Sequence, residues 1–323
     1  ELTNQLNRGI SLIDTQSEKE ALAQLNLSAC RKAEAAIAYQ AGLDYAKIGL
    51  QLLGEQAWQS QYEMALTFHN LAAELSAFCG DIPNMEASFS AVLQHTQSPL
   101  EQVNVYRIKI FSQTAQNQLA EAIDTAKESL ANFDVLLPES PTYHDIQQAM
   151  GTVNQLLGER TVDELIDLPE MVDPEQKAII DTIMSVAAAT YMSGSLLYPI
   201  LIALAVQFSI KHGNAAPSVH SYACYGMMTC NIAKDVGTGI LYGQLTQQLI
   251  PKIEDKVFKP EGLLVTGLFI AHRNNHIEST QSLLREAYAS AVEVGNLVVT
   301  GYAAGILCAN AFWTAQPLSA REE

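Results

Sequence analysis

A short joint recurs between segments with helical hydrophobic spacing, and it constrains the fold more than any other feature of the sequence. It occurs at Cys79-Gly80-Asp81, His212-Gly213-Asn214 and Val294-Gly295-Asn296, with a variant at Gln116-Asn117. Gly, and less readily Asn, adopts the left-handed conformation that closes a helix. Asp or Asn then caps the next helix. The sequence therefore predicts stacked helical hairpins.

The spacing of these joints predicts a repeat. Asp81 and Asn117 are 36 residues apart, and Asn214 and Asn296 are 82 apart, or two units of 41 with a midpoint near the polar turn 254–256. Such periods are typical of helical-hairpin solenoids, in which each unit buries its apolar face against the next. Strand signals are nearly absent. We expect an all-α fold, a tetratricopeptide-like superhelix of antiparallel helical hairpins (an α-solenoid).

The sequence suggests a boundary between two halves near the middle of the chain. A turn is expected at 137–141, which holds Pro138 and Pro141, and the acidic stretch 159–181 reads as short capped turns on the surface. We expect N-terminal helical repeats over 1–158 and C-terminal repeats over 159–323. The two halves are expected to be continuous, as one solenoid with its seam near 159–175.

An uncharged, apolar run at 196–208 raises the question of a membrane span. A span needs about 20 apolar residues, whereas this run is shorter and contains Gln207. Pro199 suits the first turn of a helix, where its missing N–H costs little. A central buried helix is therefore expected, with no membrane contact.

Composition narrows the partners and the compartment. The formal charge is −17, and the 18 basic residues are scattered, which argues against nucleic acid because phosphate binding needs clustered Lys and Arg. The five cysteines lack C-x-x-C spacing and indicate a reducing, cytoplasmic location. Because the sequence starts at Glu1 and stops at Arg321-Glu322-Glu323 without a closing element, we expect a piece of a longer polypeptide.

Several segments together resemble one known family. They are 161–174, 188–191, 208–214 and 221–226, then Trp58, Tyr62, Ala65, Leu66, Ala73, Glu74 and Gly80-Asp81, the Leu136-Leu137-Pro138-x-x-Pro141 pattern, Gly295-Asn296 and Gly301-Tyr302-Ala303-Ala304. This pattern, over roughly 30–315, resembles the helical-repeat region of very large bacterial signalling proteins. Those proteins combine a serine/threonine-kinase-like domain, an AAA-type ATPase, tetratricopeptide-like repeats, a GAF sensor and a histidine kinase. A departure is Gly-Asn at the later joints, where the family has Gly-Asp.

The resemblance implies a module without the kinase or ATPase parts. The leading hypothesis is a non-catalytic scaffold for protein–protein or interdomain interaction and signal relay, whose partners are other domains of the same parent chain and other signalling proteins. The alternative is a small-molecule sensor, with the uncharged stretch around 191–225 lining a pocket. An independent enzyme has the least support. The partner, ligand, stimulus and oligomeric state are not specified by the sequence.

No catalytic, cofactor-binding or metal residue is predicted. The phosphate-cradling G-x-x-x-x-G-K-[ST] motif is missing. Gly237-Thr238-Gly239 followed by Gly243 resembles a dinucleotide fingerprint only superficially, and a tight turn with close helix packing is favoured. His272 and His276, with Glu278 nearby, have the spacing of two imidazoles on one helical face, but they lack the H-E-x-x-H base, so polar caps beside a joint at Asn275 are favoured over zinc.

One group of residues on a single expected helix could bind a ligand. It comprises His220, Tyr222, Tyr225 and Met227-Met228, which combine aromatic, polarisable and hydrogen-bonding side chains. Such side chains occur at recognition surfaces and in adaptable cores alike. Core packing is favoured, because Met and Tyr at helical spacing more often fill an interior.

Overall fold

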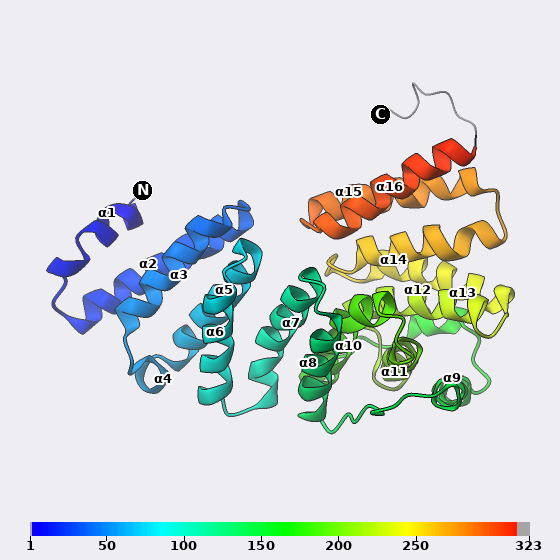
Figure 1. Ribbon diagram of the computed structural model, residues 1–323, viewed down its shortest axis with the longest axis horizontal. Helices are drawn as coiled ribbons and strands as arrows, with labels where there is room; N and C mark the ends of the chain where they lie inside the picture. The colour runs from blue at the N-terminus through cyan, green and yellow to red at the C-terminus, as the bar shows by residue number, and fades with distance from the viewer. Residues whose placement is uncertain (1, 315–323) are drawn as a thin grey trace. The chain divides into compact units, whose positions relative to one another are not determined.

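The computed structural model describes residues 2–314, which form α-helices, 3-10 turns and one π-helical turn (Figure 1). No strand occurs in this range, where a single isolated parallel bridge pairs Glu170 with Asn214. The all-α prediction is confirmed. None of the helices in the described range is both long and apolar enough to cross a membrane.

The chain divides into two compact units, Glu1–Leu136 and Leu137–Glu323. The helices of unit 1 are α1 (Leu2–Arg8), η1 (Ile10–Leu12), α2 (Gln16–Ala35), α3 (Tyr39–Leu53), α4 (Ala57–Ser60), α5 (Tyr62–Cys79), α6 (Ile82–His95), α7 (Pro99–Ala115) and α8 (Leu119–Ala131). The expected division after residue 158, and the continuity of the two halves, stay predictions.

Unit 2 holds the remaining helices. They are α9 (Tyr143–Leu157), η2 (Asp163–Asp167), α10 (Pro174–Met192), α11 (Leu197–His212), α12 (Ala216–Asn231), α13 (Val236–Leu249), η3 (Ile250–Lys252), α14 (Lys259–Val265), the π turn η4 (Thr266–Ile270), η5 (Ala271–Arg273), η6 (Ile277–Thr280), α15 (Gln281–Glu293) and α16 (Leu297–Trp313). Consecutive helices pack as hairpins in both units: α2 with α3, α5 with α6, α7 with α8, α10 with α11, α12 with α13 and α15 with α16.

The joints share one backbone geometry. At Gly80, φ is 71°, and the following N–H, of Asp81, donates to the carbonyl of Ser76 at 2.8 Å. This is the Schellman ending of a helix. The same pair of features, a positive φ and a hydrogen bond reaching five residues back, recurs at Ile37, Gly80, Asn117, Asp134, Gly194 and Gly295. The predicted joints at 80, 117 and 295 are confirmed.

The predicted joint at 213–214 is only partly right. Gly213 does end α11, with φ of 102°, but Asn214 does not cap α12. Its N–H donates to the carbonyl of Pro169, and its carbonyl accepts the N–H of Met171, both at 2.8 Å. A Cβ on Gly213 would overlap the Pro169 carbonyl, so only glycine fits beside this extended segment. Asn214 therefore binds the segment at Pro169 and Met171 instead of capping α12.

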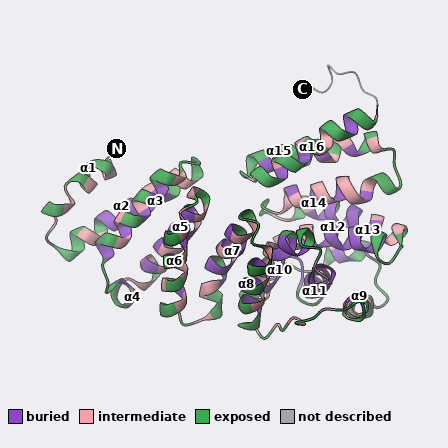
Figure 2. Ribbon diagram, viewed as in Figure 1, coloured by how far each residue is buried: buried purple, intermediate pink, exposed green. Residues whose placement is uncertain are grey.

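The core of unit 2 is centred on α11 and α12, which are buried along most of their length (Figure 2). The apolar run at 196–208 is therefore a buried helix, as expected. Close packing of α12 on α13 uses two glycines: a Cβ on Gly226 would lie 2.9 Å from the Gly239 carbonyl oxygen. The glycines at 237–243 thus lie at the start of a tightly packed helix. The sequence analysis favoured such close packing over a dinucleotide-binding loop.

Unit 1 has two apolar clusters that share one residue. The first lies among α2, α3 and α5, and the second lies among α5, α6 and α7. Trp58, on the short helix α4, packs against both clusters. Its indole stacks between His69 and His95, with ring centroids 5.1 and 4.9 Å away.

Candidate functional site

Helices α5 and α7 of successive hairpins present matched side chains to each other. Near one end, the amide of Asn104 donates to Oδ1 of Asn70 at 3.2 Å. Near the other, the rings of Phe78 and Phe111 meet edge to face with centroids 5.7 Å apart. Residues 33 or 34 apart in sequence therefore lie level with one another.

Tyr39, at the start of α3, extends this row by one more ring. Its ring stacks on Phe78 with centroids 4.6 Å apart and an interplanar angle of 19°. Phe78 and Phe111 are 43% and 45% exposed. We call Tyr39, Phe78 and Phe111 the aromatic stripe. Tyr39 is partly buried against the core, so the exposed part of the stripe is the pair Phe78 and Phe111. Contiguous rings from three hairpins, two of them exposed, are typical of an interaction surface, whereas single exposed apolar residues are ordinary.

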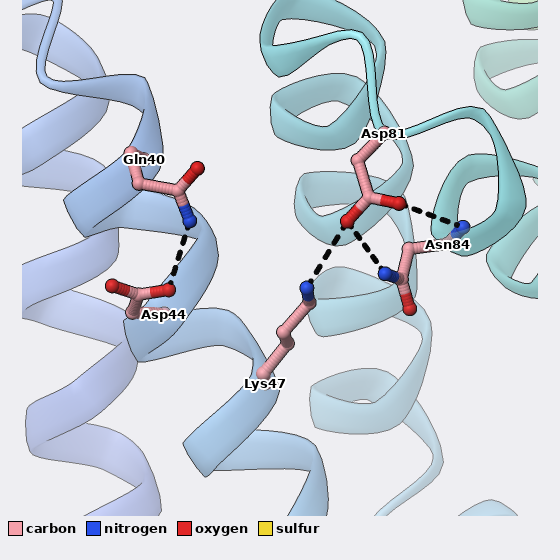
Figure 3. Close-up of polar contacts among 5 residues, drawn as sticks. All are labelled: Gln40, Asp44, Lys47, Asp81 and Asn84. Atoms are coloured by element: carbon pink, nitrogen blue, oxygen red, sulfur yellow. Dashed lines mark hydrogen bonds and ion pairs between the residues drawn. The ribbon is translucent and has the colours of Figure 1, made fainter.

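A polar cluster borders the aromatic stripe at the joint between α5 and α6 (Figure 3). Asp81 caps α6 by accepting the Asn84 backbone N–H, and it also accepts the ammonium of Lys47 from α3 at 3.2 Å. On the neighbouring turn of α3, the amide of Gln40 donates to Asp44 at 3.0 Å. The joint therefore carries two carboxylates and one cation beside Tyr39 and Phe78.

Local hydrogen bonds fix the charge of this cluster. The Asn84 side chain, followed by Lys47, lowers the pKa of the Asp81 carboxyl. Burial raises the pKa of the neighbouring Cys79 thiol, and the carboxylates of Asp81 and Asp44 raise it further. Asp81 is therefore an anion over a wide pH range, and Cys79 is a protonated thiol at neutral pH rather than a nucleophile.

Two charged side chains, Glu74 on α5 and Arg107 on α7, lie one helical turn before the rings of Phe78 and Phe111. Glu74 precedes Phe78 by four residues and Arg107 precedes Phe111 by four, so each pair shares a helix face. Burial raises the pKa of Glu74, the Glu34 carboxylate on α2 adds to this, and Arg107 opposes it. Along α5 and α7 the surface therefore runs from amide to charge to aromatic ring, a pattern that suits an extended segment or a helix of a partner.

His272 and His276 have the spacing of zinc ligands in sequence, but they do not lie on one face of a helix. His272 lies in η5, whereas His276 lies beyond the end of η5 and caps η6 by accepting the Glu278 N–H at 3.3 Å. The helix breaks between them after the π turn η4. The prediction that both imidazoles lie on one helical face is wrong, and His276 has the capping role. Within residues 2–314, no group of three or more His, Cys, Asp or Glu side chains is arranged to hold a metal ion.

The residues singled out at 220–228 belong to the core of unit 2. Tyr222, Tyr225, Met227 and Met228 are buried on α12, and the hydroxyl of Tyr222 donates to Asn214 Oδ1 at 2.8 Å. Burial also lowers the pKa of the His220 imidazole to about 4. The expectation of core packing is confirmed for the four Tyr and Met side chains.

Two open clefts lie elsewhere. One, of about 450 Å³, is in unit 2 between the η3 region, α14 and α15, with Ile250, Leu263 and Leu283 beside Lys256 and Lys259. The other, of about 420 Å³, is in unit 1 near Lys32 and Tyr45. Neither lies at the aromatic stripe.

The sequence analysis did not find the aromatic stripe. The available signal was the separation of Phe78 and Phe111 by 33 residues, close to the separations of the joints themselves. Tyr39 gave no signal, because its joint is built on Ile37, a residue that sequence rules do not place at positive φ.

Comparison with known proteins gives one distant similarity. Over 333 aligned residues, covering 94% of this chain, the sequence is 22% identical to the hybrid signal transduction histidine kinase G of Dictyostelium discoideum. The chain spans about a tenth of the length of that protein. No family model matches the chain, and no solved structure matches it.

Proposed function

We propose that the chain is a tetratricopeptide-like, non-catalytic scaffold that docks protein segments and relays a signal within a large cytoplasmic signalling protein. Three polar contacts support the repeat: Lys47 with Asp81, Asn70 with Asn104, and Glu261 with Asn296. They span 34, 34 and 35 residues, and 34 is the tetratricopeptide period. The same register thus occurs within each unit.

The signalling context rests on resemblance. The similar Dictyostelium protein is named a signal transduction histidine kinase, and this chain aligns with about a tenth of it. The sequence also resembles the helical-repeat region of large bacterial kinase and ATPase proteins, apart from Gly-Asn at its later joints. The partners proposed are therefore other domains of the same polypeptide, and other signalling proteins, while catalysis belongs to those domains.

The observation that carries the docking role is the aromatic stripe. Phe78 and Phe111 expose nearly half of their surface, and their rings lie in one row with Tyr39, which stacks on Phe78, beside the carboxylate of Asp81 at the α5–α6 joint. Burying such rings against a partner would contribute about 25 cal/mol per Å² of apolar surface. The flanking carboxylates favour a partner segment that carries Lys or Arg next to apolar side chains.

A photo-crosslinking experiment in the full gene product tests this role. A photoreactive phenylalanine analogue at position 78 or 111 is expected to crosslink to one defined segment, identified by mass spectrometry. The same analogue at Leu136, which is 83% exposed, serves as the matched control. The double variant Phe78→Asp/Phe111→Asp is expected to weaken the response of phosphorylation to stimulus. Crosslinks at 78 and 111 no more defined than at 136, with an unchanged response, would refute the proposal.

The second candidate is a small-molecule sensor, and it rests on the cleft at α14 and α15. Its apolar wall, formed by Ile250, Leu263 and Leu283, adjoins Lys259, whose ammonium pairs with Glu286 at 2.8 Å. An amphiphilic anion would suit that lining. Thermal shift against sugars, nucleotides and lipids tests it: a stabilising hit that Leu283→Trp abolishes supports a sensor, and the absence of any hit argues against one.

A further inference from the structure

The cleft of about 450 Å³ in unit 2 is lined by apolar side chains from three separate elements. Ile250, Pro251 and Ile253 come from η3 and the irregular segment that follows it, Leu263 comes from α14, and Leu283 comes from α15. The volume lies within the range of about 300–1,000 Å³ that is typical of small-molecule sites. We call this site the α14–α15 cleft.

The apolar lining of the α14–α15 cleft is continuous with a hydrophobic core cluster. Leu263 forms that cluster with Ala287 and Ala303, and Ile250 and Leu283 pack against it while they stay partly exposed. Core packing therefore holds the apolar lining in place before any ligand arrives. A hydrocarbon group that covers the exposed part of this lining would gain about fourfold in affinity for each CH₂ removed from water.

Two lysines line the α14–α15 cleft, and they differ in how firmly each is paired. Nζ of Lys259 lies 2.8 Å from Oε1 of Glu286, which also lines the cleft, and the side chain of Lys259 is only 23% exposed. Nζ of Lys256 lies 4.0 Å from Oε1 of Glu293, and these two side chains are 61% and 66% exposed. An exposed ion pair at such a distance contributes little. Lys256 is therefore the cation that an anionic ligand can bind without breaking a firm ion pair.

The carboxylates near Lys256 do not line the α14–α15 cleft. Glu254 and Asp255 precede it in sequence and Glu293 faces it, but all three lie outside the lining. Oδ1 of Asp255 accepts the backbone N–H of Val257 at 2.9 Å. Within the lining, two ammonium groups accompany one carboxylate, which is an excess of one positive charge in a chain of net charge −17. That local excess favours a ligand with a single negative charge.

We infer that the α14–α15 cleft binds an amphiphile with one anionic head group, a carboxylate or a phosphodiester, and that Lys256 binds this head group. The hydrocarbon tail lies against Ile250, Leu263 and Leu283, where the lining is apolar. Lys259 stays paired with Glu286 and does not select the ligand. This inference rests on the small-molecule sensor role given above as the second candidate, and it adds the orientation of the ligand and the residue that selects its charge.

Calorimetric titration of the full chain with dodecanoate, below its micelle concentration, tests the role of Lys256. Lys256→Met keeps the apolar stem and should weaken binding by about tenfold or more, the typical effect of losing a hydrogen bond to a charged group. Lys252→Met removes the same charge four residues away, outside the lining, and should change the affinity by less than about twofold. Dodecanol, which has the same tail without the charge, should bind the wild-type chain and Lys256→Met alike.

Leu283→Trp separates this inference from the sensor role itself. A tryptophan at 283 fills the apolar part of the cleft and should abolish the binding of dodecanoate and dodecanol together. If neither probe binds the wild-type chain, the sensor role and this inference both fail. If both probes bind and Leu283→Trp abolishes their binding, but Lys256→Met binds dodecanoate as tightly as the wild-type chain does, the sensor role stands and the assignment of Lys256 is overturned. Thermal unfolding without ligand checks that each variant folds.

Lipid vesicles distinguish a free amphiphile from a membrane lipid as the source of the ligand. The full chain is sedimented with phosphatidylglycerol vesicles, and phosphatidylcholine vesicles are the control without net charge. Dodecanoate binding without vesicle binding supports a free acid. Sedimentation with phosphatidylglycerol that Lys256→Met weakens supports a phosphodiester head group in the same cleft. Equal sedimentation with both vesicle types, unchanged in Lys256→Met, would contradict a site that selects for charge.

Discussion

Asn214 binds two parts of unit 2 at once: its amide donates to the Leu165 carbonyl at 2.8 Å while its Oδ1 accepts the hydroxyl of Tyr222, also at 2.8 Å. Both bonds are buried, and the first spans 49 residues. The backbone of Asn214 adds the bridge to Pro169 and Met171. One side chain therefore ties the segment before α10 to the central helix α12.

Removing this side chain should destabilise unit 2 strongly. Asn214→Ala leaves a buried carbonyl and a buried hydroxyl without partners, and each unsatisfied group costs about 1–3 kcal/mol. We expect a loss of about 3 kcal/mol in urea unfolding. Asn154→Ala, an exposed substitution on α9, is the control and should change stability by less than about 0.5 kcal/mol. A loss at 214 no larger than at 154 would show that the bonds contribute little.

Ile37 should be replaceable by glycine with a gain in stability. Its φ of 59° is left-handed, a conformation that costs a non-glycine residue about 1–2 kcal/mol, and its side chain is 64% exposed. Ile37→Gly should therefore raise the free energy of unfolding by about 1 kcal/mol. Ala36→Gly, at the adjacent residue with negative φ, should lower it slightly. A destabilised Ile37→Gly would mean that the apolar contacts of Ile37 outweigh its strain.

Acid should weaken unit 1 through His69. Burial, aided by His95, lowers the pKa of His69 to about 4, against about 6.5 in an unfolded chain. As the pH falls, the unfolded state takes up the proton before the folded state does. The free energy of unfolding is therefore unaffected by His69 above about pH 6.5 and decreases as the pH falls from there toward 4.

His69→Phe keeps a ring against Trp58 and should flatten the pH dependence over that range. Unfolding followed by Trp58 fluorescence in a Trp313→Phe background reports the change in unit 1. His144→Phe, at an exposed imidazole, should leave the slope unchanged. An unaltered slope in His69→Phe would contradict the assignment.

Glu261 should make stability depend on pH in the opposite direction, with a loss as the pH rises. Burial raises its pKa to about 7, while its own backbone N–H and the Asn296 amide, 2.6 Å away, act against the shift. Its Oε2 has no hydrogen-bond partner in the described chain. The folded state holds the proton longer, so stability falls as the pH rises from about 4.5 through 7.

Glu261→Gln should therefore stabilise unit 2 at pH 8 by about 1–2 kcal/mol, and much less at pH 5. The glutamine keeps an oxygen for Asn296. Glu254→Gln, outside the α14 packing, is the control. Equal effects of Glu261→Gln at the two pH values would show that the carboxyl titrates normally.

Sequence rules predicted the elements that local chemistry decides. Joints built on Gly80, Asn117 and Gly295 follow from residue type alone. Ile37 was missed, because a β-branched residue at positive φ is held there by its surroundings and not by preference. Asn214 looked like a cap and is a buried cross-link, since one of its side-chain partners, the carbonyl of Leu165, lies 49 residues away.

The candidate site was harder to predict than the fold. The aromatic stripe depends on how far each hairpin advances along the array, and that advance is set by packing between helices. The prediction that His272 and His276 share a helical face was wrong for a related reason. The π turn at Thr266–Ile270 ends the regular helix before the second imidazole. Periodicity indicates a helix but does not locate such a break.

The recurring joints also bear on how the chain reaches its native state. At six of the joints, the reversal is closed by a hydrogen bond that reaches back only five residues, as from Asp81 to Ser76, so a hairpin can form there without contacts from distant parts of the sequence. Chains dominated by such short-range closures collapse quickly, since little loop entropy is lost before the first contacts form. Each hairpin of unit 1 is therefore expected to form on its own early during synthesis, whereas the bridge from Asn214 to Leu165 closes late and sets the pace for unit 2.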